Sequence, residues 1–253
     1  MKDIMSLPKN FHPPPDLLAG RSVMITGASG GFGRALSLAC AHAGASVILV
    51  GRNGAKLDRL YDEIEALGKA QPAIAVLDLA TATAAEYDRL ADTVGQEFGK
   101  LDGLVHAAAL LGDRTPLEQY DVPTWCRVLH VNLTAPFILT QVLLPNLRKS
   151  ADASIIFVSS GVVYNPRAFW GAYAVSKTGL EAIRSMLSQE LEGEGNIRVN
   201  SVNPGRMRTP MRAAAYPAED PNTLPDPSSV ANSFLYLLSA QGSDIDGQYF
   251  DAQ

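Results

Sequence analysis

Short apolar runs rich in β-branched residues alternate along the chain with longer segments in which apolar residues recur every three or four positions. The short runs predict buried strands, and the longer segments predict amphipathic helices. Strands are expected at 22–26, 46–50, 73–77, 103–106, 154–159, 198–202 and 248–250. Crossover helices are expected at 31–43, 56–67, 84–98, 123–147, 173–191 and 228–238.

This alternation predicts an α/β fold, because parallel strands need long crossover connections that place helices on both faces of a sheet. A chain of 253 residues can form one such layered unit. We therefore expect a single-domain, Rossmann-type, doubly wound parallel sheet of about seven strands. An N-terminal arm, residues 1–19, is expected to precede the catalytic domain of residues 20–253.

Residues 204–227 break the alternation and carry little strand pattern. Prolines recur throughout this segment, at Pro204, Pro210, Pro217, Pro221, Pro225 and Pro227. A long irregular segment in a compact domain is more often an active-site loop than a linker, and this one follows a predicted strand. We interpret it as the substrate loop.

Composition and charge narrow the possible partners. Apolar residues make up 47% of the chain and charged residues 19%, which fits a folded core. The net charge of −5 gives no broad attraction to nucleic acid or anionic lipid. No secretion signal and no apolar run of about 20 residues is visible, so we expect neither nucleic acid nor membrane as a partner and a cytoplasmic location.

Cys40 and Cys126 lie in apolar helical segments without metal-ligand spacing. Both are expected to be buried thiols, and no metal site is expected.

The first predicted strand runs directly into a glycine-rich turn, Gly27 to Gly33, which is followed by a helical segment. Glycine allows backbone to approach a pyrophosphate, whose charge is stabilised by free N–H groups at a helix N-terminus. A glycine-rich turn without a ligand is the alternative. The order strand, turn, helix favours dinucleotide binding.

The sequence TGASGGFG at 26–33 resembles the TGxxxGxG pattern of the short-chain dehydrogenase/reductase family, and the resemblance extends from about Ser22 to the C-terminus. It implies hydride transfer between a nicotinamide cofactor and a small carbonyl or alcohol compound. It also places Asp78 beside the adenine ring, although a helix N-cap is an alternative role for this residue. The cofactor-binding residues expected in this part of the chain are Gly27, Ser29, Gly31, Phe32, Gly33, Asp78 and Leu79.

The second predicted strand is followed by Gly51-Arg52-Asn53 and not by a carboxylate. An acidic side chain at this position would accept hydrogen bonds from the ribose of NAD and repel a 2′-phosphate. Arg52 can instead bind that phosphate through charge-assisted hydrogen bonds. We expect NADP(H) in preference to NAD(H); a solvated surface charge is the alternative for Arg52.

Tyr173 and Lys177 are four residues apart in a predicted helix, so their side chains share one face. A phenol is a poor acid at neutral pH unless a cation stabilises its anion, and we expect Lys177 to lower the pKa of Tyr173 in this way. A half-buried tyrosine beside an exposed lysine is the alternative.

The family resemblance adds further residues to this pair. Ser160 lies 13 residues before Tyr173, the family interval between the catalytic serine and tyrosine, with Ser159 as its competitor. Asn132 matches the family asparagine that holds a helix backbone. The resemblance therefore implies a catalytic tetrad of Asn132, Ser160, Tyr173 and Lys177. The segment that resembles PGxxxT implies further cofactor contacts from Pro204, Gly205 and Thr209, beside Tyr173 and Lys177.

Two motifs depart from the family pattern. The sequence His106-Ala107-Ala108-Ala109 replaces the usual NNAG, and FDAQ ends the chain where a DGG-like sequence is common. His106 is expected to be a hydrogen-bonded structural residue and not a base. A narrower resemblance, to the bacterial YciK-like oxidoreductases, is carried by segments 110–113, 169–173, 211–217, 219–221 and 250–253.

No sequence motif identifies the substrate, but the residues expected to form the wall of its pocket are apolar or aromatic. It comprises Tyr164, Phe169, Trp170, Met207, Met211 and Tyr216. A homodimer or homotetramer is expected from the long helices, as in the family. A catalytically degenerate NADP-binding regulatory or scaffold protein is the main alternative, favoured only by the HAAA sequence; a sugar-nucleotide epimerase is disfavoured by chain length and glycine spacing.

Overall fold

Eight parallel strands form one sheet in a computed structural model that describes residues 5–6, 11–69 and 71–253. The strand order is β1-β8-β7-β6-β5-β2-β3-β4. The strands are β1 Met5–Ser6, β2 Ser22–Thr26, β3 Ser46–Gly51, β4 Ala73–Val76, β5 Gly103–His106, β6 Ala153–Val158, β7 Ile197–Asn203 and β8 Tyr249–Asp251. The order reverses between β2 and β5, which confirms the predicted doubly wound sheet.

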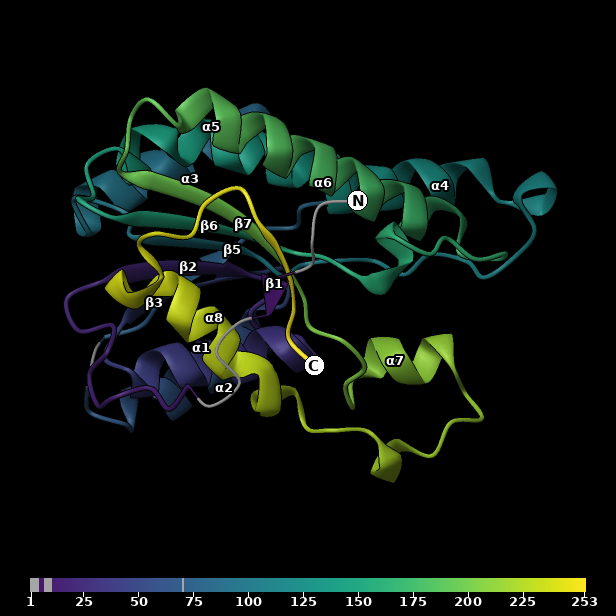
Figure 1. The fold of residues 1–253 in the computed structure, drawn as a ribbon, viewed down its shortest axis with the longest axis horizontal. Coiled ribbons are helices and arrows are strands. Elements are labelled where there is room, and N and C mark those ends of the chain that lie inside the picture. Colours follow the sequence, from purple (N-terminus) through teal and green to yellow (C-terminus); the bar gives the residue numbers. More distant parts are fainter. Residues whose placement is uncertain (1–4, 7–10, 70) are drawn as a thin grey trace.

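Helices cover both faces of this sheet (Figure 1). One face carries α1, α2 and α8, and the other carries α3, α5 and α6, with α4 and α7 beyond the strand ends. The helices are α1 Gly31–His42, α2 Gly54–Glu65, α3 Ala84–Glu97, α4 Val122–Leu129, α5 Ala135–Leu147, α6 Gly171–Leu191, α7 Pro210–Ala215 and α8 Ala231–Leu238. Each face has its own cluster of buried apolar side chains.

The central strands β2, β5 and β6 are buried along their whole length. Strands buried on both faces read as continuous apolar runs, which is why the sequence pattern identifies them. Thr26 at the end of β2 pairs with His106 at the end of β5, and His106 pairs with Phe157 of β6. The loops that follow these strands therefore start at one edge of the sheet.

The N-terminal arm adds a strand that the sequence pattern did not predict. Met5 and Ser6 pair in parallel with Phe250 and Asp251 of β8. Two residues are too few to show a period, which is why pattern reasoning stops at seven strands. Residues 1–4 and 7–10 of the arm lie outside the described residues.

The predicted helix 123–147 is divided into α4, a π-helical turn at His130–Thr134, and α5. By length and composition alone, Val122–Leu147 is apolar enough to cross a membrane. Leu139, Leu143 and Leu147 are nevertheless fully buried in the core cluster on that face of the sheet. The segment packs as a core helix, and such helices pass the same test of length and hydropathy.

Segment 204–227 is more ordered than its prolines suggested. It contains α7 and the 3₁₀ turn Pro221–Thr223, and a second 3₁₀ turn, Pro227–Val230, begins at its last residue. A proline begins each of the three elements. Proline has no N–H and a fixed φ, so it suits the first helical position, where no intrahelical hydrogen bond is lost.

The two cysteines differ in exposure. Cys40 is fully buried, as predicted, but Cys126 is exposed, so that prediction is wrong. Cys126 lies on α4, where only Val128 is buried, because this short helix lies beyond the strand ends and packs mainly against α6.

Candidate active site

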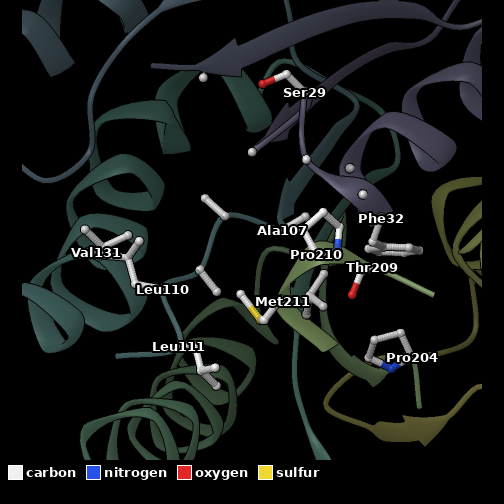
Figure 2. A pocket seen from close by; sticks show the side chains of 18 of the residues that line it. Ser29, Phe32, Ala107, Leu110, Leu111, Val131, Pro204, Thr209, Pro210 and Met211 are labelled. Carbon is white, nitrogen blue, oxygen red and sulfur yellow. The ribbon is translucent and has the colours of Figure 1, made fainter. Parts of the chain in front are cut away.

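A cleft with a volume of about 620 Å³ lies at the carboxyl ends of the central strands. It is lined by the glycine turn and Ser29, by Tyr173 and by residues of α7. Figure 2 shows Leu110 and Leu111 on one side of it and Met211 on the opposite side. Open parallel sheets bind ligands at such a point, where the strand order reverses.

The glycine turn has the close backbone approaches that a pyrophosphate site needs. Gly27 has a φ of +66°, and a Cβ on this residue would lie 2.8 Å from Cα of Ala108. A Cβ on Gly33 would lie 2.2 Å from the carbonyl oxygen of Gly27. The N-cap of α1, Gly30, offers no side-chain hydrogen bond to the first N–H groups of the helix. These N–H groups are available to an anion, so the turn fits a dinucleotide.

Asp78 and Leu79 line the cleft after β4. The Asp78 carboxylate accepts a hydrogen bond from the N–H of Ala80 at 3.0 Å. The N-cap of α3 is Thr83, which forms a capping box with Glu86. Asp78 therefore stabilises a turn, and the alternative of a helix N-cap is wrong.

Two cations line the cleft near Ser29. Arg52 and Lys56 are both exposed, and neither forms a salt bridge within the described part of the chain. Asn53 lies between them and accepts a hydrogen bond from the N–H of Lys56 at 3.0 Å, which caps α2. The predicted basic site thus gains Lys56, which sequence reasoning missed; its position four residues after Arg52, at the start of the following helix, was the available signal.

Asn132 lies in the π-helical turn and is completely buried. Its Oδ1 accepts a hydrogen bond from the N–H of Leu110 at 2.7 Å, and its Nδ2 donates to the carbonyl of Leu110 at 2.8 Å. Nδ2 also lies 3.1 Å from Oγ of Ser176 in α6. Asn132 therefore joins three segments and does not itself line the cleft.

Ser160, Tyr173 and Lys177 come together at the floor of the cleft. The Ser160 hydroxyl hydrogen-bonds to the Tyr173 phenol, whereas the Ser159 hydroxyl is buried without a partner among the described residues. Lys177 Nζ donates to the carbonyl of Val158 at 2.7 Å and lies 5.8 Å from the centroid of the Tyr173 ring. The geometry thus favours Ser160 over Ser159.

Burial has the largest effect on the pKa values of Tyr173 and Lys177. It raises the pKa of Tyr173, and the hydrogen bond to Ser160 offsets only part of that increase. Burial also lowers the pKa of Lys177 to about 8, against a smaller opposite effect of Glu181. The expectation that Lys177 lowers the pKa of Tyr173 is therefore wrong for this arrangement, because the ammonium group is directed to the Val158 carbonyl.

The outer wall of the cleft is apolar, as expected, but its residues differ from the predicted set. Trp170, Met207 and Met211 line it, whereas Tyr164, Phe169 and Tyr216 do not. Tyr164 and Phe169 are about half exposed, and the Tyr164 ring packs on Tyr249. Lining residues missed in the sequence include Leu110, Leu111, Val131 and Ala215. The position of Leu110 and Leu111 in the loop that follows a central strand was the available signal.

His106 is a structural residue, as predicted. Its Nε2 lies 2.8 Å from Oγ1 of Thr140, its ring stacks on Phe157, and burial lowers its pKa to about 3. Oγ1 of Thr26 accepts hydrogen bonds from the N–H groups of Ala107 and Ala108, each at 3.1 Å. The HAAA sequence therefore retains an ordered strand end beside the glycine turn.

Pro204, Gly205 and Thr209 line the cleft between β7 and α7. A Cβ on Gly31 would lie 2.9 Å from Cγ2 of Thr209, so this segment closes over the glycine turn. Phe32 lines the same end. No group of three His, Cys, Asp or Glu side chains suited to a metal ion is found among the residues whose positions are described.

Comparison with known protein families agrees with this arrangement. The model of the short chain dehydrogenase family matches residues 21–220. The chain belongs to the short-chain dehydrogenase family. This short-chain dehydrogenase is accordingly an oxidoreductase.

Its relatives include the oxidoreductase YciK of Escherichia coli K12, which is 41% identical over 244 residues, 96% of each chain. A short chain dehydrogenase structure from Pseudomonas syringae is 47% identical, with a TM-score of 0.94 over 96% of this chain and 99% of the other. One from Shigella flexneri, complexed with NADP, is 41% identical, with a TM-score of 0.92 over 95% of this chain and 100% of the other. The resemblance to YciK-like oxidoreductases is thus confirmed.

Proposed function

We propose that this short-chain dehydrogenase binds NADP(H) and interconverts a small, largely apolar carbonyl compound and its alcohol, with Tyr173 as general acid and base. One observation carries the proposal. A single continuous cleft joins a glycine turn suited to pyrophosphate with the group formed by Ser160, Tyr173 and Lys177.

The charges in the cleft favour NADP(H) over NAD(H). Arg52 and Lys56 line the end near Ser29, and neither is neutralised by a carboxylate within the described residues. A 2′-phosphate would be bound there by charge-assisted hydrogen bonds. The NADP complex of the Shigella flexneri relative supports the same choice. The residues proposed to hold the cofactor are Gly27, Ser29, Gly31, Phe32, Gly33, Arg52, Asp78, Leu79, Tyr173, Lys177, Pro204, Gly205 and Thr209.

The four tetrad residues have distinct proposed roles. NADPH supplies the hydride when it is bound. Ser160 and Tyr173 hydrogen-bond the substrate oxygen, and the Tyr173 hydroxyl donates its proton as negative charge develops there. Lys177 holds a proton at Nζ with a pKa of about 8, and its ammonium group is proposed to bind the nicotinamide ribose. Asn132 positions the Leu110 backbone at the cleft wall.

The alternative of a degenerate scaffold has less support. The HAAA sequence was its one favourable feature, and the Thr26 hydrogen bonds to Ala107 and Ala108 preserve that strand end. All four tetrad residues are present, and three of them line the cleft.

Titration of the purified protein with NADPH and NADH, followed by nicotinamide fluorescence, tests the cofactor choice. A panel of apolar and aromatic aldehydes and ketones, followed by NADPH oxidation, tests the chemistry. We expect tighter binding of NADPH and turnover of at least one carbonyl compound. Tight NADPH binding without any turnover would favour the scaffold alternative, and absence of binding would exclude both.

The setting of the enzyme is part of the proposal. We place it in the cytoplasm, with a catalytic domain from residue 20 onward and a substrate loop near 204–227. Phe137, Val175 and Met186 are about half exposed on α5 and α6, which favours a homodimer or homotetramer through these helices. Size-exclusion chromatography with light scattering measures that state, and a monomeric mass would contradict it.

A further inference from the structure

A stack of aromatic rings and guanidinium groups lies along the outer wall of the cleft. Its first member is Tyr173, whose ring centroid lies 5.7 Å from that of Trp170. The guanidinium carbon of Arg114 lies 4.6 Å from the Trp170 ring centroid and 5.0 Å from that of Tyr216. The guanidinium carbon of Arg212 lies 3.8 Å from the centroid of the Tyr216 ring. The stack thus runs from the proposed proton donor to the residue after α7.

Arg114 joins two parts of the chain that are distant in sequence. Besides its contacts with both rings, its Nη1 donates a hydrogen bond to the carbonyl of Ala215, the last residue of α7. It forms no salt bridge with any carboxylate of the described residues. Its charge is therefore directed to ring faces and to the end of a helix, where cations are favoured.

The loop that carries Arg114 is fixed from behind by Tyr120. The Tyr120 hydroxyl accepts a hydrogen bond from the N–H of Asp113 at 3.1 Å, and its ring is almost fully buried. A Cβ on Gly112 would lie 2.3 Å from the Tyr120 hydroxyl, and one on Gly171 would lie 2.5 Å from its ring. Two glycines are thus required for Tyr120 to hold this loop against the start of α6.

Arg114 contacts α7 on its other side, and α7 is too short to be stable by itself. It has six residues, and a helix of this length is not stable without tertiary contacts. Arg212 ties it to the following turn through a bidentate salt bridge to Glu219, with Nη2 and Oε1 2.6 Å apart. Met211 and Ala215 of this helix line the cleft. The position of α7 therefore decides how much space lies over Tyr173.

We propose that Arg114 is a positioning residue that holds α7 against Trp170 and so fixes the outer wall of the substrate cavity. Arg114 does not line the cleft itself, whereas Trp170 and Ala215, which it contacts, both do. Loss of Arg114 would leave the tetrad in place but allow α7 and Trp170 to move. The consequence for substrate binding rests on the proposed function; the mechanical role of Arg114 does not.

The chain contains two tryptophans, Trp125 and Trp170, so a Trp125→Phe background leaves Trp170 as the sole indole reporter. In that background we compare Arg114→Met, which keeps the volume but loses the guanidinium, with Arg114→Lys, which keeps the charge. The matched control is Arg208→Met. Arg208 lies in the segment that leads into α7, in an exposed salt bridge with Asp226 at 3.6 Å.

We expect Arg114→Met to raise the acrylamide quenching constant of Trp170 by about two-fold, because a local opening exposes the ring. Arg114→Lys should give an intermediate value and Arg208→Met the value of the background protein. Unchanged quenching in Arg114→Met, or an equal increase in Arg208→Met, would overturn the proposal. If Arg114→Met does not fold, as judged by circular dichroism, Arg114→Lys replaces it in the test. A higher quenching constant than that of the background protein then supports the proposal, and an unchanged constant overturns it.

Steady-state kinetics in the same variants separate positioning from catalysis. With any carbonyl compound that the enzyme reduces, Arg114→Met should raise KM by about five-fold or more while kcat and the Kd of NADPH change by less than about two-fold. An unchanged KM would contradict a role in shaping the cavity. If the background protein reduces no carbonyl compound, the proposed function fails, and the quenching result still decides the role of Arg114.

Discussion

The two side chains proposed for proton transfer, Tyr173 and Lys177, are both buried, with exposures of 8% and 2%. Burial favours the neutral form of each, so it raises the pKa of the phenol and lowers that of the ammonium. The spacing of YxxxK predicts that the two residues share a helix face. The directions of their pKa shifts follow from burial, against smaller opposite effects of Ser160 on Tyr173 and of Glu181 on Lys177, and no sequence pattern contains them.

Tyr173→Phe should abolish most turnover without loss of the fold. The phenyl ring keeps the packing against Trp170, but the donor to the substrate oxygen is lost, which costs about 10²- to 10⁴-fold in kcat. The Kd of NADPH should change by less than about three-fold. Stopped-flow turnover together with fluorescence titration measures both, and a fully active variant would refute the proton-donor role.

The buried ammonium of Lys177 predicts a pH-dependent stability. Its pKa falls from 10.5 to about 8 on folding, so between these pH values the unfolded chain binds more protons than the folded protein. The free energy of unfolding should therefore rise with pH across this window, on the order of 2 kcal/mol, and the full cost of the buried charge should apply below about pH 8.

Urea unfolding of the native protein and of Lys177→Met at several pH values measures this effect as a difference. As pH rises from 8 to 10, the free energy of unfolding of the unmodified protein should increase relative to that of Lys177→Met. A pH-independent difference would show that Lys177 is not buried as an ammonium below pH 8.

The basic pair near α2 predicts a selective change in cofactor affinity. Arg52→Ala should weaken NADPH by about 10- to 100-fold and NADH by less than about three-fold, because only NADPH has the 2′-phosphate. Lys56→Ala should have the same selectivity with a smaller effect. Arg59→Ala, an exposed arginine further along α2, is the control. Equal weakening of both cofactors in Arg52→Ala would remove the assignment.

At the scale of elements, sequence patterns succeed where a strand or helix is long and buried on a regular face. The bounds of β2, β5 and α3 lie within one residue of their predicted positions. The π-helical turn between α4 and α5 was not predicted, because apolar periodicity does not distinguish it from the helices on either side. Asn132 binds the backbone of Leu110, which lies 22 positions away in the sequence.

Asn132→Ala tests this joint between elements. It would leave the N–H and carbonyl groups of Leu110 without their partner, which should cost about 3 kcal/mol in the free energy of unfolding. Asn165→Ala, at an exposed asparagine, should change it by less than about 0.5 kcal/mol. Equal unfolding midpoints in urea for the two variants would contradict the structural role of Asn132.

At the scale of the whole molecule, alternation of strands and helices predicts where the cleft must lie, since all parallel strands end at one edge of the sheet. Most of the proposed cofactor and catalytic residues do line one cleft at that edge. Two features were beyond the pattern: the pairing of β1 with β8, and the contacts of Arg114 with Trp170 and Tyr216. Both join segments far apart in sequence through a few side chains or residues, which leaves no periodic signal.

A crystal structure of the protein with bound NADPH tests the central claim most directly. It should show the pyrophosphate at the turn of Gly27 to Gly33, the 2′-phosphate beside Arg52, and the reactive face of the nicotinamide toward the Tyr173 hydroxyl. A dinucleotide bound elsewhere, or a nicotinamide turned away from Tyr173, would contradict the account.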